Sequence, residues 1–185
     1  MTQNLPLIDY NIFLIGFMGV GKSTIAQELK TKLNMDRMEM DQTIVQRQGM
    51  SISDIFDRYG ESYFRDLETN LLIELQTGQR TIVSCGGGVV VRQENITHMK
   101  KHGRIVLLTA SPETIYERVK TSTERPILNN NMNVDFIRNL MEKRREQYLE
   151  AADITITTDD KTAAQICEEI MAKLITSDCQ LEGDC

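Results

Sequence analysis

The stretch GFMGVGKST, residues 16–24, decides the fold class of this chain. It matches the pattern G-x-x-x-x-G-K-[ST], follows the apolar run NIFLIG and precedes apolar residues at helical spacing. In this pattern, glycines let the loop wrap so that backbone N–H groups and the helix N-terminus face an anionic phosphate. The alternative is a glycine-rich turn with an exposed lysine, but context and spacing together favour a phosphate-binding loop.

The loop predicts a nucleoside triphosphate and Mg²⁺ as ligands, and it leaves the acceptor of the phosphate open. Lys22 is placed to reach the β- and γ-phosphates, and the Ser23 hydroxyl is placed to bind the metal ion. The predicted nucleotide-binding residues of the loop are Gly19, Val20, Gly21, Lys22, Ser23 and Thr24.

Apolar runs alternate with helical patterns along the chain. The runs NIFLIG, RMEMD, TIVSC, RIVLLT and DITITT predict five strands. Helical spacing follows the phosphate loop and recurs in residues 51–75, with a break near Gly60, and in 134–152 and 162–174. Ser111 followed by Pro112 marks a further helix start. This alternation predicts an α/β fold of the P-loop NTPase class: a three-layer sandwich with a five-stranded parallel sheet and helices on both faces.

The length of 185 residues favours one domain. We expect that domain to span residues 1–174. It would include a lid segment at about 120–133, because that stretch is polar, rich in asparagine and long for a connection. Residues 175–185 are interpreted as a disordered C-terminal tail.

Charge and composition exclude several classes of partner. A net charge of −6 disfavours nucleic acid, and no apolar run approaches the length of a membrane span. The N-terminal residues lack the pattern of an export signal. The four cysteines have neither metal-type spacing nor the density of a disulfide framework, which favours reduced thiols in the cytoplasm. We expect a cytoplasmic monomer that acts on a small molecule.

Three features fall where the phosphate acceptor must lie, outside the carboxyl ends of the parallel strands. Asp41 follows the second strand and could accept a proton or hydrogen bond from an acceptor hydroxyl; its alternative role is a helix cap. Gly86, Gly87 and Gly88, here called the glycine triplet, follow the third strand and form either a bulge or a floor of bare backbone for a substrate. The segment 120–133 would exclude water from the reaction.

Taken together, these segments resemble the shikimate kinase family. The resemblance rests on GFMGVGKST, on DQTIVQRQGMSISDIF leading to GESYFRDLE, and on SCGGG, ERPIL and EKRREQY, in the family's order. Many NTPases share the phosphate loop, whereas the glycine triplet with the F-R-x-x-E and R-P-L-like segments is more selective. The resemblance implies transfer of the γ-phosphate of ATP to the 3-hydroxyl of shikimate, which is a step of chorismate and aromatic amino-acid biosynthesis.

The resemblance also implies roles for individual residues. Asp41 would hold the shikimate hydroxyls and act as the base, and Arg65 and Arg144 would clamp the shikimate carboxylate. The glycine triplet would contact the substrate through its backbone. Arg125, before Pro126, would reach the phosphates from the lid, and Arg118 would pack near adenine. The catalytic residues implied are Lys22, Asp41 and Arg125.

Some of these assignments have alternatives within the sequence. Arg65 could form a surface ion pair with Glu68 at the i,i+3 spacing. Arg125 could be an ordinary loop arginine. The choice of Arg144 over Arg145 rests on the alignment of Tyr148, four residues after Arg144.

The chain departs from the family where D-x-D is usual, because it has EMD at residues 39–41. Glu39 thus replaces a carboxylate that is thought to organise Mg²⁺ through water, and its extra methylene puts the metal geometry in question. In the acidic loop after the last strand, only Lys161 could supply a basic contact to nucleotide. Two other functions compete: a P-loop kinase for another polyol acid such as gluconate, and a nucleotide-binding module without catalysis.

Overall fold

A computed structural model describes residues 8–75, 80–120 and 133–182. Its central sheet has five strands: β1 (Asn11–Ile15), β2 (Asp36–Glu39), β3 (Thr81–Ser84), β4 (Gly103–Thr109) and β5 (Ile154–Thr157). The strand order is β2-β3-β1-β4-β5, and every neighbouring pair is parallel. The predicted five-stranded parallel sheet is confirmed, and β1, which leads into the phosphate loop, is its middle strand.

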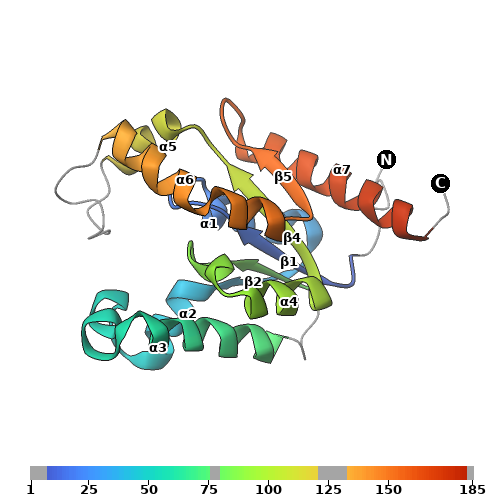
Figure 1. The fold of residues 1–185 in the computed structure, drawn as a ribbon. Coiled ribbons are helices and arrows are strands. Elements are labelled where there is room, and N and C mark those ends of the chain that lie inside the picture. The colour runs from blue at the N-terminus through green and yellow to red at the C-terminus, as the bar shows by residue number, and fades with distance from the viewer. Residues whose placement is uncertain (1–7, 76–79, 121–132, 183–185) are drawn as a thin grey trace.

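Helices cover both faces of the sheet (Figure 1). Their bounds are α1 Lys22–Leu33, α2 Met40–Gln48, α3 Ile52–Glu74, α4 Gln93–His102, α5 Pro112–Val119, α6 Val134–Ala151 and α7 Ala163–Glu182, with a 3-10 turn, η2, at Val89–Val91. Side-chain caps explain several of the starts. Ser51 and Asp54 form a capping box at α3, Ser111 accepts from the Thr114 N–H at α5, and Asn133 caps α6.

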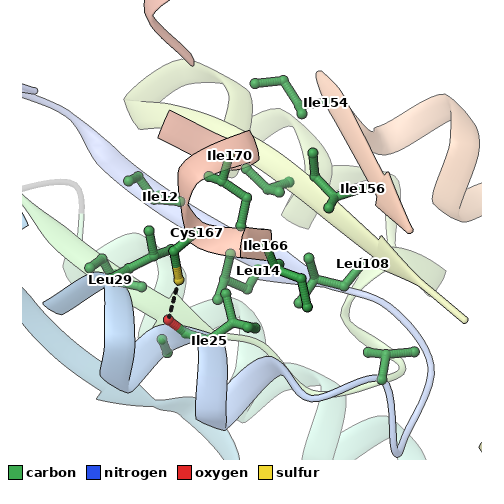
Figure 2. Packing of buried hydrophobic residues seen from close by; sticks show 14 of the residues in the cluster. Ile12, Leu14, Ile25, Leu29, Leu108, Ile154, Ile156, Ile166, Cys167 and Ile170 are labelled. Carbon is green, nitrogen blue, oxygen red and sulfur yellow. Dashed lines mark hydrogen bonds between the residues drawn. The ribbon is translucent and has the colours of Figure 1, made fainter. Parts of the chain in front are cut away.

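Alternating side chains of β1 build two hydrophobic cores, one on each face of the sheet. Ile12 and Leu14 point into a core with α1 and α7, whereas Phe13 and Ile15 point into a core with α3 and α4. Figure 2 shows the first core, where Cys167 of α7 lies against the carbonyl oxygen of Ile25 in α1. This packing holds α1, and with it the phosphate loop, against the sheet.

The break in α3 was predicted from the sequence, whereas helix α4 was not. The break near Gly60 is confirmed, because Gly60 has φ 81° and ψ 169° inside α3. Helix α4 was not expected, since its sequence QENITHMKKH has few apolar residues. Ile96 and Met99, three residues apart, bury its inner face.

The expected end of the last helix at residue 174 is wrong, because α7 continues to Glu182. No glycine or proline interrupts residues 175–182. Asp178 in this extension accepts hydrogen bonds from the Tyr10 hydroxyl at 2.5 Å and from Arg104 at 3.0 Å. The disordered tail predicted for 175–185 is therefore helical as far as residue 182, and residues 183–185 lie outside the described ranges. Within those ranges, every helix is too short or too polar to cross a membrane.

Candidate active site

The phosphate loop connects β1 to α1 at the carboxyl edge of the sheet. Gly16, Gly19 and Gly21 all have positive φ, at 136°, 80° and 99°. A Cβ on Gly16 would overlap the Leu108 carbonyl oxygen, and one on Gly19 would lie 2.7 Å from a Val119 methyl group. The loop conformation therefore requires glycine for backbone freedom and for space.

The start of α1 carries positive charge and no acidic side chain in its first turn. Lys22 Nζ donates to the carbonyl oxygens of Gly16 at 2.7 Å and Phe17 at 3.1 Å, so its ammonium group lies across the loop. The N-cap of α1 is Gly21, which offers no capping side chain, and the first turn carries no acidic residue. The helix N-terminus thus suits a phosphate group rather than a protein carboxylate.

The side chains beside the loop fit a magnesium ion. Ser23 Oγ lies 2.9 Å from Glu39 Oε2 at the end of β2, so a hydroxyl and a carboxylate oxygen face each other. Mg²⁺ prefers oxygen ligands and takes only one or two from protein in phosphate sites, with water and phosphate supplying the others. The longer side chain of Glu39 therefore still reaches the predicted metal ligand.

Arg118 of α5 joins the phosphate loop to the loop after β5. Its guanidinium donates to Thr158 Oγ1 at 3.0 Å and to the Thr158 carbonyl oxygen at 3.1 Å. It also donates to the carbonyl oxygen of Val20 at 3.3 Å. These contacts place Arg118 between the two loops, whereas Lys161 is ion-paired with Glu169.

The glycine triplet makes room for side chains of the chain itself. A Cβ on Gly86 would lie 2.6 Å from Glu68 Oε1 and 2.7 Å from Asp41 Oδ1, and a Cβ on Gly88 would overlap the Arg65 guanidinium. The glycine triplet therefore does more than form a bulge, because its missing side chains leave space for these three residues. Asp41 lies in the first turn of α2, whose N-cap is Glu39, so the helix-cap alternative for Asp41 is wrong.

Arg65 belongs to a buried ion pair. Its Nη1 lies 2.6 Å from Glu68 Oε2, and its Nη2 lies 2.7 Å from Glu61 Oε1. The alternative of a pair with Glu68 is thus present, but the Arg65 side chain is 9% exposed and that of Glu68 is 0% exposed, so only its expected surface location is wrong. Burial raises the pKa of Glu68, and the nearby Arg65 charge opposes that rise. Glu68 therefore fixes the arginine where the glycine triplet ends.

Arg144 reaches the same triplet from α6. Its Nη1 donates to the Gly87 carbonyl oxygen at 3.1 Å, and the Tyr148 hydroxyl donates to the same oxygen. Arg145, the neighbour in sequence, instead faces Glu142 at 3.5 Å with 66% of its side chain exposed. The geometry favours Arg144 over Arg145 as the inward arginine.

The structure thus brings together the loop residues and Asp41, Arg65, Arg144 and the glycine triplet. Arg125 and residues 121–132 of the expected lid lie outside the described ranges, so their role stays a prediction. The contact of Tyr148 with the Gly87 carbonyl oxygen was not predicted, and Glu68 was expected only as a surface partner of Arg65. Glu68 lies in the segment GESYFRDLE and Tyr148 in EKRREQY. The glutamate of the F-R-x-x-E pattern was the feature of the sequence that pointed to Glu68.

Comparisons with known proteins agree with this arrangement. The family model for shikimate kinase matches residues 18–175. A shikimate kinase of Sulfurihydrogenibium sp. (strain YO3AOP1) is 42% identical over 164 residues, which cover 89% of this chain and 97% of the relative.

Two solved structures support the same family. A shikimate kinase from Acinetobacter baumannii in complex with shikimate has a TM-score of 0.84 and 30% identity, with 90% of this chain and 93% of that chain covered. A shikimate kinase from Aquifex aeolicus has a TM-score of 0.76 and 38% identity, covering 89% of this chain and 95% of the other. The fold, the site and the sequence agree, and the chain belongs to the shikimate kinase family.

Proposed function

We propose that this protein transfers the γ-phosphate of ATP to the 3-hydroxyl of shikimate, giving shikimate 3-phosphate and ADP. The observation that carries the proposal is that the glycine triplet lies beside the phosphate loop. A Cβ on Gly87 would lie 3.9 Å from the carbonyl oxygen of Gly16, which also accepts the hydrogen bond from Lys22. An acceptor held against the triplet therefore lies beside the phosphate that Lys22 binds.

The acceptor side fits a compact ring with one carboxylate and several hydroxyls. Arg144 and Arg65 approach the triplet at Gly87 and Gly88, and planar guanidinium groups bind a carboxylate with both charge and orientation. Asp41 lies beside Gly86, where a carboxylate can accept hydrogen bonds from ring hydroxyls. The two arginines thus suit the carboxylate of shikimate, and Asp41 suits its ring hydroxyls.

Each group has a defined part in the transfer. The 3-hydroxyl oxygen attacks the γ-phosphorus, the bond from that phosphorus to the β–γ bridging oxygen breaks, and ADP leaves with the electron pair. Asp41 accepts the hydroxyl proton, and Lys22 balances charge on the transferred group. Ser23 would hold Mg²⁺ and Glu39 would orient its shell; when bound, the ion would supply charge neutralisation for the phosphate oxygens. We assign Arg125 to the phosphates from the sequence resemblance, and Arg118 to the adenine side from its position between the two nucleotide loops.

A coupled assay of ADP release tests the assignment. We expect release with shikimate and only background rates with gluconate or without an acceptor. Release with gluconate alone would establish the other kinase function, and no release with either would leave a binding module. Cytoplasmic location, a monomeric state and a single domain remain further proposals, which rest on composition and length.

The Gly87→Ala variant tests where the acceptor lies. Within the protein, a Cβ at Gly87 meets nothing closer than the Tyr148 hydroxyl at 3.8 Å, and Gly87 is not among the glycines with positive φ. We expect an unchanged melting temperature and apparent ATP affinity, but roughly tenfold or greater loss of kcat/KM for shikimate, since overpacking costs about 1–3 kcal/mol. Normal use of shikimate would place the acceptor elsewhere.

A further inference from the structure

Arg37 and Glu39 lie on the same face of β2, which is one of the two edge strands of the sheet. They are two residues apart, and successive side chains of a strand point to opposite faces. Met38, between them, packs against the core that contains Met40 and Ile44. Arg37 and Glu39 therefore project to the other face, where Glu39 meets Ser23 at the start of α1.

The two carboxylate oxygens of Glu39 have different partners. Oε1 lies 3.2 Å from Arg37 Nη1, whereas Oε2 accepts the hydrogen bond from Ser23 Oγ at 2.9 Å. The Glu39 side chain is 12% exposed and that of Arg37 is 29% exposed. The arginine thus binds the oxygen that does not face the proposed metal ligand.

A glutamate at this position needs such a restraint more than an aspartate does. Its extra methylene adds a rotatable bond, and the final torsion of glutamate is broad rather than confined to narrow rotamers. Without a second contact, the carboxylate could rotate or withdraw from Ser23. The contact with Arg37 restricts that motion from the opposite side.

We propose that Arg37 is a positioning residue for the magnesium site. It holds the Glu39 carboxylate so that Oε2 stays against Ser23 Oγ, and it thereby raises the affinity of the nucleotide complex for a divalent cation. The inference rests on the proposed magnesium-dependent function, with Ser23 as the metal ligand. It also explains how this chain accommodates Glu39 where the family resemblance leads one to expect aspartate.

Two effects of Arg37 on the metal oppose each other. Orientation of Glu39 favours the cation, whereas the positive charge of the guanidinium disfavours it. The charge effect is weakened because Arg37 is partly exposed and paired with Glu39, so solvent and the carboxylate both screen it. The proposal requires the orientation effect to be the larger one. Loss of Arg37 should therefore weaken cation binding, whereas a dominant charge effect would strengthen it.

Mn²⁺ binding in the presence of ADP, followed by the electron paramagnetic resonance signal of free Mn²⁺, tests the proposal. For Arg37→Met we expect about tenfold weaker Mn²⁺ binding, the lower end of the range for outer-shell partners of metal ligands. Arg37→Lys should restore part of the affinity, since it keeps a donor but loses the planar fork. ADP binding without metal should not change.

Two controls separate positioning from a general effect of charge or stability. Arg47→Met removes an arginine that pairs with Glu74 across α2 and α3, and we expect normal Mn²⁺ binding. Adding Arg37→Met to Glu39→Ala should cost nothing further, because the group that Arg37 positions is gone. Unchanged or tighter binding by Arg37→Met, or a further loss in the double variant, would overturn the proposal. Turnover of shikimate by the wild type, measured separately, tests the proposed function itself.

Discussion

The Lys22→Met variant is expected to lose turnover by about 10²–10³-fold, the usual cost of removing one group that stabilises transition-state charge. Lys22 Nζ lies across the phosphate loop on the Gly16 and Phe17 carbonyl oxygens, where it balances charge on the transferred phosphoryl group. The glycine conformations and the helix N-terminus remain, so the variant should still fold and bind some nucleotide. The rate of ADP release with shikimate measures the effect.

Lys30→Met is the matched control for this variant. Lys30 lies on the same helix, α1, with its side chain in solvent, so its loss should leave kcat unchanged. Circular dichroism melting of both variants checks that the fold is kept. A near-normal kcat for Lys22→Met would remove the assignment of the phosphate loop.

The Arg144→Ala variant is expected to lose kcat/KM for shikimate by roughly 10²–10³-fold, with an almost unchanged KM for ATP. Arg144 contacts the Gly87 carbonyl oxygen, and losing one partner of a desolvated charge pair costs about 2–5 kcal/mol. Steady-state kinetics with each substrate varied in turn measures both constants. Arg145→Ala, one residue farther along α6, is expected to behave as wild type, because Arg145 is exposed. An effect on ATP alone would show that Arg144 does not bind the acceptor.

The second inward arginine, Arg65, calls for a different substitution. Arg65→Ala would leave the buried Glu68 carboxylate without its cation, and breaking a buried pair in this way costs about 3–5 kcal/mol of stability. Loss of folding would then hide any effect on shikimate. Arg65→Lys keeps the charge and removes the planar fork, so it separates substrate recognition from stability.

Local sequence patterns predicted much of the fold, because the strands and most helices have apolar runs or helical spacing that can be recognised within a short stretch of sequence. The phosphate loop, the break at Gly60 and the Ser111 cap of α5 were all readable in this way. Helix α4 was not predicted, because it buries only a narrow apolar stripe. The extension of α7 was not predicted, because it is held by contacts of Asp178 with Tyr10 and Arg104, which lie far away in sequence.

The site was predictable in its residues but not in its contacts. The motifs identified Arg65, Arg144 and the glycine triplet, yet they did not reveal that Gly88 makes room for the Arg65 guanidinium. The burial of Glu68 and the division of the Glu39 oxygens between Arg37 and Ser23 are tertiary features. Such contacts depend on how β2, α1 and α3 pack, which no short window of sequence records.

Phosphorus-31 NMR of the complete reaction tests the central claim most directly. With ATP, Mg²⁺ and shikimate, we expect one new phosphomonoester resonance coupled to the ring proton at position 3, in an amount equal to the ADP formed. Inorganic phosphate without that resonance, or a phosphomonoester that forms only when gluconate replaces shikimate, would contradict the account.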